Sequence, residues 1–266
     1  MFRGLKIMAG TLAMGVFAWG AAPAANPGKD LPTFGVLKTP TGAETKAQAE
    51  AWLSSRGAIS AEARKAFNAI WDSTDTLSGK LAQTFALGDT GAAKILQEAR
   101  HANLEAPMEI PALFKDNSKS LFYRANLAVA YARVLGQNKV YDLGLETLKL
   151  FRPEQVADPA TFLFQRAVAE YSLMLKKEAD DSITRLLDDV SEAPERYRNV
   201  AALMSIDMMS WREKDLGWIS RKMGTIHRRL DLAQGGKKTQ KMQKEVVARL
   251  DEMIKELENQ AKSGGT

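Results

Sequence analysis

Two histidines and the carboxylates near them are the side chains of this sequence best suited to metal chemistry. Glu98 and His101 form an E-x-x-H pair, and Glu105 follows, so a helix here would place three ligand-type side chains on one face. Di-iron carboxylate bundles use this pair twice, with further glutamates. The other histidine, His227, lies beside arginines and has no carboxylate in the preceding turn. A solvated helix face is therefore the favoured interpretation, and we expect no metal or cofactor.

Nucleophilic and phosphate-binding motifs supply no further candidate. The sequence has no cysteine, which excludes disulfides, thiol catalysis and cysteine-based metal sites. It also lacks the G-x-S-x-G, P-loop and dinucleotide-binding glycine patterns. We therefore predict that the protein is not an enzyme. A carboxylate-based site assembled in space on an all-α fold stays open as an alternative.

Length and charge are those of an ordinary globular protein. The chain has 266 residues, of which 45% are hydrophobic and 26% charged, enough apolar mass for a sizeable core. The formal net charge is +5, and it would fall to +3 if Arg3 and Lys6 were removed during maturation. Such a weak bias argues against nucleic acid as a partner.

The N-terminal segment has the three parts of a secretory signal peptide. Arg3 and Lys6 are followed by an uncharged, mostly apolar run over 7–20 and by the small-x-small sequence Ala22-Pro23-Ala24. We expect cleavage near Ala24, which makes 1–24 the signal peptide and places the mature protein in the periplasm or cell envelope. Retention of this run as a membrane anchor is the alternative, although the run is short for a spanning helix.

Helical periodicity dominates the chain after an extended leader over 25–45. That leader is rich in Pro, Gly and Thr, and no later stretch alternates apolar and polar residues as a strand would. Asp158-Pro159 is a typical helix start, and Gly57, Gly88 and Gly136 are candidates for left-handed helix ends. The sequence predicts an all-α fold with helices near 46–56, 59–72, 77–87, 89–104, 119–136, 140–151, 160–176, 179–190, 195–211, 213–231 and 237–262.

A weak internal repeat indicates how these helices pack. The segments LAVAYARVLG (127–136) and RAVAEYSLML (166–175) each lie in a long predicted helix, at an offset of 39 to 40 residues. The pattern resembles tetratricopeptide repeats, but it lacks their Trp-Leu-Gly start and a clear proline end. We expect 46–234 to form stacked antiparallel helix pairs, as an α-solenoid, a tetratricopeptide-like array or an irregular helical bundle.

Basic residues gather before and after Gly235-Gly236. Arg228 and Arg229 precede this glycine pair, and Lys237 and Lys238 follow it. A solvated surface is the plainest interpretation of such a cluster. The functional interpretation is contact with an acidic partner or with lipid head groups, so these residues are candidate partner contacts.

The hinge and closing helix, over 235–266, carry the second set of candidate partner contacts. Val247, Leu250, Ile254 and Leu257 alternate spacings of three and four, as in a short coiled coil, and β-branched residues at a with Leu at d favour a parallel pair. Three further apolar residues, Met242, Val246 and Met253, widen the stripe. The helix therefore either caps the preceding helix pair or serves a homodimer or another protein.

The closing segment also resembles the C-terminal region of exported bacterial helical proteins without an assigned activity. The resemblance lies in TQ-x2-QKEVV-x2-LDE-x-IKELE, over 239–258. It supplies no catalytic residue and implies only a recurring interaction element. We therefore predict an exported, non-catalytic protein-binding or scaffold protein. The alternative is a structural protein of the cell envelope, held at a membrane by its N-terminus or its basic cluster.

Overall fold

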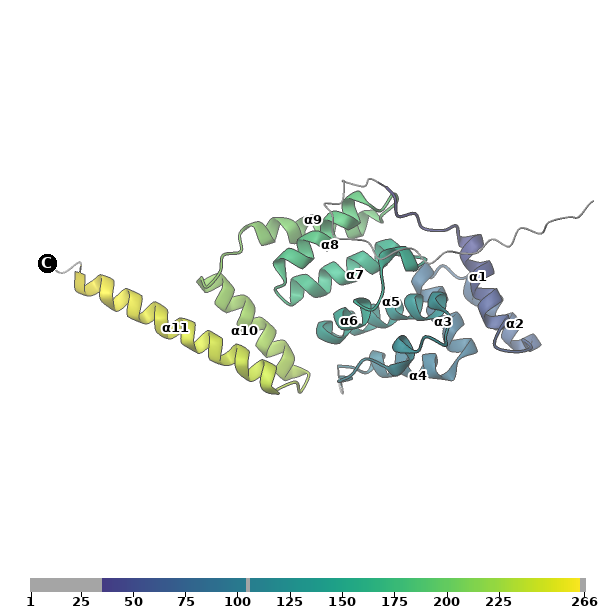
Figure 1. Cartoon of the computed structure of the whole chain (residues 1–266), viewed down its shortest axis with the longest axis horizontal. Helices are drawn as coiled ribbons and strands as arrows, with labels where there is room; N and C mark the ends of the chain where they lie inside the picture. Colours follow the sequence, from purple (N-terminus) through teal and green to yellow (C-terminus); the bar gives the residue numbers. More distant parts are fainter. Residues whose placement is uncertain (1–34, 104–105, 264–266) are drawn as a thin grey trace, which may run out of the picture. The chain divides into compact units, whose positions relative to one another are not determined.

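The computed structural model describes residues 35–103 and 106–263, and over these residues the fold is all-α, as predicted (Figure 1). Apart from one isolated β-bridge, the described residues contain no strand pairing. The predicted signal peptide and the first part of the predicted leader lie outside the described residues. The α-helices are α1 (Gly42–Ser54), α2 (Ala61–Asp72), α3 (Leu77–Gly88), α4 (Thr90–Arg100), α5 (Leu121–Gln137), α6 (Tyr141–Leu148), α7 (Pro159–Ser172), α8 (Lys176–Asp188), α9 (Glu195–Met209), α10 (Leu216–Asp231) and α11 (Lys237–Ser263), with short 3-10 helices η1 (Ala112–Lys115) and η2 (Pro153–Gln155).

Side-chain caps fix where several helices begin. The side chain of Asp158 accepts a hydrogen bond from the backbone of Thr161 at the start of α7, as the Asp-Pro pair predicts. Thr41 and Glu44 form a capping box, which begins α1 at Gly42. The predicted leader over 25–45 was therefore too long, because its last four residues belong to this helix.

The left-handed residues that end helices differ from the predicted ones. Gly88 and Gly136 lie within α3 and α5, so their predicted role as left-handed helix ends was wrong. A positive φ occurs at Gly57, outside the helices, as well as at Gly35. Among the described non-glycine residues, positive φ angles occur at Lys139, Met174, Lys214 and Ala233.

Helices α1 to α9 share one hydrophobic core, and α5 lies within it. Leu127, Tyr131 and Leu135 of α5 are fully enclosed. Helix α5 packs on α3, α4, α6 and α7, and α8 packs on both α7 and α9. From α2 to α9, successive helices therefore pack against one another as expected, whereas α1 packs mainly on α3 rather than on α2.

The two central hairpins, α5/α6 and α7/α8, repeat at 35 residues rather than at the predicted 39 to 40. Their turns are left-handed at Lys139 and Met174, 35 positions apart. Gly144 of α6 packs against Ala132 of α5, and the position 35 residues after Gly144 is the buried Ala179. The alanine runs that suggest the longer offset therefore do not occupy equivalent positions in the two hairpins.

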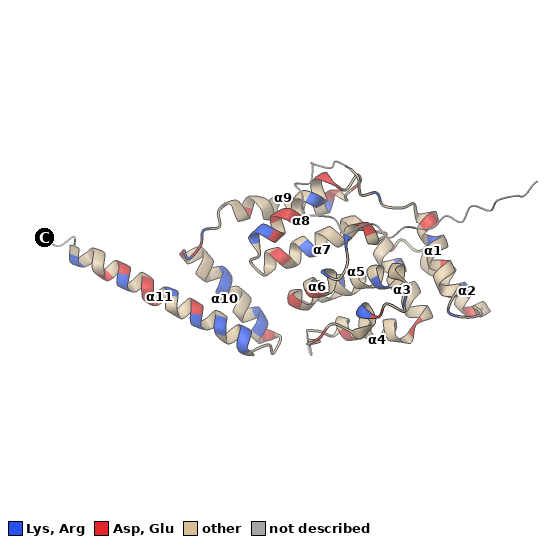
Figure 2. Ribbon diagram, viewed as in Figure 1, with Lys and Arg blue, Asp and Glu red and all other residues tan. Residues whose placement is uncertain are grey.

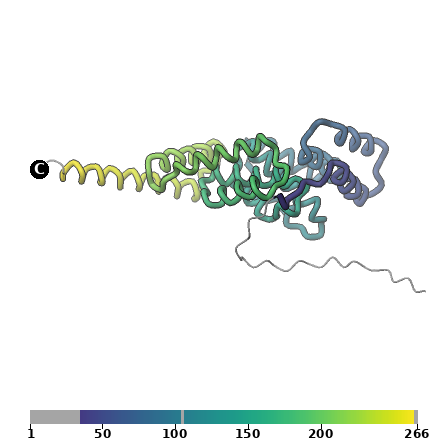
Figure 3. Tube along the Cα trace, turned by 90° about the horizontal axis from the view of Figure 1, so that it is seen from above, coloured from purple at the N-terminus to yellow at the C-terminus, as the bar shows by residue number. Residues whose placement is uncertain are grey.

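Helices α10 and α11 form an antiparallel hairpin with a small core of its own. Ile219, Ile226 and Val246 are buried there, covered by Trp218, Met242 and Met253. Figures 1 and 3 show α11 continuing past the start of α10. This hairpin therefore needs further contacts to hold it to the rest of the helices.

The segment before α1 also makes a contact far along the chain. The backbone N–H groups of Gly35 and Leu37 donate to the carbonyls of Asp188 and Asp189, and Leu37 accepts from Ser191. Leu37 and Val190 form a parallel β-bridge, and both side chains are buried. This stretch of the predicted leader is thus part of the folded core.

Candidate protein-interaction surface

One face of α11 packs on α10. This is the first of the two arrangements that the sequence left open, in which the closing helix covers the preceding helices. Val246, Met242 and Met253 point toward Ile219 and Trp218 of α10. An ion pair between Lys222 and Glu245 crosses the hairpin near its middle. Further along α11, Arg249 Nε donates to the backbone carbonyl of Lys214, which lies just before the start of α10. The residues of α11 after Met253 are all exposed as far as Ser263.

The predicted seam of α11 is not part of this packing. Its four side chains are between 38% and 63% exposed: Val247, Leu250, Ile254 and Leu257. Three apolar side chains of α10 are also between 48% and 65% exposed: Leu216, Met223 and Leu230. These seven residues are called the hairpin face below. Each helix of the hairpin therefore has one buried and one exposed apolar stripe.

The two exposed stripes lie on the same side of the hairpin. With 3.6 residues per turn, the α10 stripe is about 90° from the α10 residues that contact α11, and the α11 stripe is about 90° from the residues that contact α10. Viewed along each helix from its N-terminus, the exposed stripe is rotated about the helix axis in the same direction from the residues that contact the other helix. Because the two helices are antiparallel, this rotation places both exposed stripes on one side of the hairpin. The hairpin face is thus a single two-helix surface.

The predicted basic cluster is used mainly inside the molecule. Arg229 Nη1 donates to Asp142 Oδ2 over 2.7 Å, and Lys238 Nζ lies 2.5 Å from Asp142 Oδ1. Arg228 Nη1 is 3.9 Å from the same carboxylate, and it donates to the carbonyl of Lys139 over 2.8 Å. These groups form the Asp142 cluster, which ties α10 and α11 to α6. Of the four predicted basic contacts, Lys237 and Lys238 remain exposed.

Two contributions of opposite sign act on the pKa of Asp142. Burial alone would raise it, but the hydrogen bond from Lys238 and the charges of Lys238, Arg229 and Arg228 outweigh burial and lower the pKa. The carboxylate therefore stays ionised at neutral pH. The side chain of Arg229 is only 10% exposed, so it is not available to a partner in this arrangement.

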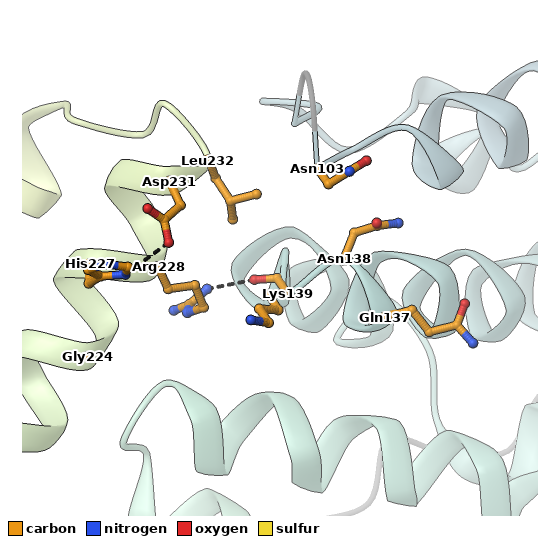
Figure 4. A pocket seen from close by; sticks show the side chains of 9 residues that line it. All are labelled: Asn103, Gln137, Asn138, Lys139, Gly224, His227, Arg228, Asp231 and Leu232. Carbon is orange, nitrogen blue, oxygen red and sulfur yellow. Dashed lines mark hydrogen bonds and ion pairs between the residues drawn. The ribbon is translucent and has the colours of Figure 1, made fainter.

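An open pocket of about 640 Å³ lies beside this cluster, between the end of α10 and the turn that joins α5 to α6 (Figure 4). His227 Nδ1 is 2.9 Å from Asp231 Oδ2, and the Arg228 guanidinium reaches the Lys139 carbonyl. Asn103 and Asn138 line the opposite wall. The exposed His227 has a carboxylate partner, and the lining residues include no serine, threonine or tyrosine hydroxyl. The pocket is therefore lined mainly by amide and charged groups.

The E-x-x-H segment does not assemble a metal centre in the described residues. Glu98 lies 3.8 Å from Lys94, and His101 caps the end of α4. Glu105 lies outside the described residues. Across 35–103 and 106–263, no group of three or more His, Asp or Glu side chains could hold a metal ion. The same ranges contain no helix with the length and apolarity needed to cross a bilayer.

Comparison with known proteins gave no match: the chain fits no protein-family model, and neither a curated protein nor a solved structure is significantly similar to it. The two resemblances noted from the sequence therefore stay predictions. The residues above are interpreted from their own chemistry.

Sequence reasoning missed two features of this surface. Leu216, Met223 and Leu230 alternate with Ile219 and Ile226 at spacings of three and four, which is typical of a single helix face, although a strict spacing of seven separates the exposed residues from the buried ones. Asp142 was not recognised because it is a lone acidic residue 87 positions before Arg229. The spacing of seven was present in the sequence, whereas the Asp142 contact had no local signal.

Proposed function

We propose that the protein is exported and acts without catalysis, as a protein-binding or scaffold protein. The observation that supports this proposal is the hairpin face, seven large apolar side chains exposed on one side of two helices. Contiguous exposed apolar surface is unfavourable in water, and it commonly marks an interaction site. Helix α11 thus has two roles, with one stripe packed on α10 and another available to a partner.

Export is the second part of the proposal, and the 7–20 apolar run with its Ala-Pro-Ala site supports it. If the run is retained instead, the protein is a structural protein of the envelope. Membrane attachment through the basic cluster is the weaker form of that alternative, because Arg229 and Lys238 already form ion pairs with Asp142. Mass spectrometry of the N-terminus and fractionation of the cell distinguish these cases. A full-length chain found in the cytoplasm would exclude both.

The binding role is tested by cross-linking in cells that express the protein naturally. A Leu250→Glu/Ile254→Glu double variant places two charges in the hairpin face, and we expect it to lose the cross-linked species formed by the unaltered chain. The matched control is Lys255→Glu/Lys262→Glu, which changes two exposed residues of the same helix outside the face. Equal helicity of the three proteins excludes a folding defect. Cross-linked species that persist equally in the double variant would overturn the proposal.

A further inference from the structure

We infer that a second copy of this chain covers the hairpin face, with the two α11 helices antiparallel. The inference rests on the proposed function, because it assigns a partner to the same face. The face is suited to another helix of the same kind, because it consists of two neighbouring apolar stripes on antiparallel helices. The α11 helix of the second copy would pack against both the α11 stripe and the α10 stripe of the first copy, as helices do in a four-helix bundle.

The charge order along α11 favours an antiparallel pair over the parallel pair that its a and d residues alone would favour. Four exposed lysines lie in its first eight residues: Lys237, Lys238, Lys241 and Lys244. Acids outnumber bases among the exposed residues of the following half, where Asp251, Glu252, Glu256 and Glu258 stand against Lys255 and Lys262. Two of these acids, Glu252 and Glu256, accept hydrogen bonds from Arg249, whereas Asp251 and Glu258 have no such contact in the described structure. Figure 2 shows several blue residues where α11 begins, beside the end of α10, and both red and blue residues along the rest of the helix. An antiparallel pair places each basic segment beside the acidic segment of the other copy, whereas a parallel pair places like charges together.

The helix dipole makes this charge order unfavourable for an isolated helix. Acids stabilise the N-terminus of a helix and bases its C-terminus, but the first turn of α11 has no acid. Asp142 compensates Lys238 within the chain. A second α11 in the antiparallel direction would supply negative charge to Lys241 and Lys244, which the chain itself does not pair in the described structure.

The apolar spacing gives the register of this pair. The seam is symmetric about the midpoint between Leu250 and Ile254, so Leu250 would face Ile254 of the second copy, and Val247 would face its Leu257. Lys244 would then lie beside Glu258 of the second copy on both sides of the dimer. The two Asp251 residues would approach each other at the two-fold axis.

The stripe on α10 supplies the area that α11 lacks. A seam of fewer than three heptads is short for a stable free coiled coil, and stable interfaces bury about 800 Å² per partner. Leu216 and Met223 lie beside the α11 seam on the same side of the hairpin. They widen the contact from a seam to a two-helix surface.

Single-cysteine variants of the full chain test the orientation, because the sequence has no cysteine of its own. With a short bis-maleimide we expect Asp251→Cys to form a covalent dimer. Leu257→Cys should not, because the antiparallel register separates the two 257 positions by roughly 15 Å. Lys255→Cys, on the outer side of α11, is the control. Cross-linking of Leu257→Cys without Asp251→Cys would overturn the antiparallel pair in favour of a parallel one.

Light scattering of the full chain tests the second copy itself. We expect twice the 29.2 kDa chain mass at micromolar concentration. Lys244→Glu should raise the dimer dissociation constant about fivefold to tenfold, and the Lys244→Glu/Glu258→Lys swap should restore it, whereas Lys255→Glu should have no effect. A monomer at all concentrations would overturn the inference. The proposed function would still stand if the Leu250→Glu/Ile254→Glu variant lost a different partner in cells.

Discussion

Arg229 donates from Nη1 to Oδ2 of Asp142 over 2.7 Å, although the two residues are 87 positions apart in the chain. The Nε of the same guanidinium donates to Thr239 Oγ1 over 2.8 Å. One buried side chain of α10 therefore contacts both α6 and α11. Since α10 and α11 have a separate hydrophobic core, this polar contact is a main link between the hairpin and the other helices.

Removing the Asp142 charge should loosen the α10/α11 hairpin. In Asp142→Asn the amide keeps the size of the side chain, but it leaves the buried Arg229 without a counter-charge. We expect a loss of about 2–4 kcal/mol in the free energy that holds the hairpin in place. Hydrogen exchange of the α10 amides measures this loss. The control is Glu146→Gln, which removes an exposed partner of Lys149 and should change stability by less than about 0.5 kcal/mol.

Acid should loosen the same hairpin. The pKa of Asp142 is lowered in the folded protein, so the unfolded state binds a proton more readily, and the stabilisation is lost as the pH falls through the folded pKa. The contribution is complete above the ordinary aspartate pKa of about 4 and declines below it. Hydrogen exchange of α10 at pH 7 and pH 3 should differ in the unaltered chain after correction for the intrinsic rate. This difference should be smaller in Asp142→Asn, and an equal difference would contradict the assignment.

Glu170 should show the opposite pH dependence. Burial raises the pKa of this carboxyl, and the hydrogen bonds from Arg166 and Ser182 only partly oppose it. The folded state therefore binds the proton more tightly, so its contribution to stability is present below the ordinary glutamate pKa of about 4.3 and is lost as the pH rises through the raised value. We expect Glu170→Gln to remove this decline. Urea unfolding of both proteins between pH 4 and pH 8 measures it.

Two helical glycines should respond oppositely to alanine. A Cβ at Gly88 would lie 2.7 Å from Leu53 Cδ1 and 2.8 Å from the Trp52 ring, which is stacked on Tyr123. Because these side chains are buried, Gly88→Ala should destabilise the protein by about 1–3 kcal/mol. At Gly144 the nearest atoms are 3.6 Å away, so Gly144→Ala should gain up to about 1 kcal/mol of helix propensity.

Thermal unfolding of both variants against the unaltered chain gives the comparison. The measurement is internally controlled, since each variant adds one methyl group to a helical glycine. Destabilisation of similar size at both positions would show that the two helix contacts are equally tight, and it would contradict the packing described here.

Local structure was predicted well from the sequence because its causes are local. The Asp158-Pro159 start of α7 and the start of α3 at Leu77 follow from capping and periodicity within a few residues. The exposed seam of α11 was also identified from its spacing. Local patterns were misleading at Gly88, where close packing against Trp52 and Leu53, and not a left-handed turn, accounts for the missing side chain.

Long-range contacts set the boundary of what could be predicted. A cluster of arginines and lysines has the same appearance in the sequence whether it faces solvent or a single buried aspartate. Asp142 turns Arg229 from a surface residue into an internal one, and only the fold brings the two together. The side of the hairpin on which Leu216 lies likewise depends on how α10 rotates against α11.

The contact between Leu37 and Val190 bears on how the helices come apart. In a linear series of hairpins, each unit touches only its neighbours, so unfolding can begin at either end and proceed stepwise. Here the residues just before α1 are hydrogen-bonded to those at the end of α8, with Gly35 and Leu37 donating to the carbonyls of Asp188 and Asp189. Fraying at α1 therefore has to break backbone bonds at the far end of α8 as well. The segment from Gly35 to Ser191 is closed into a loop, which should make its melting a single cooperative event rather than a progression from one terminus.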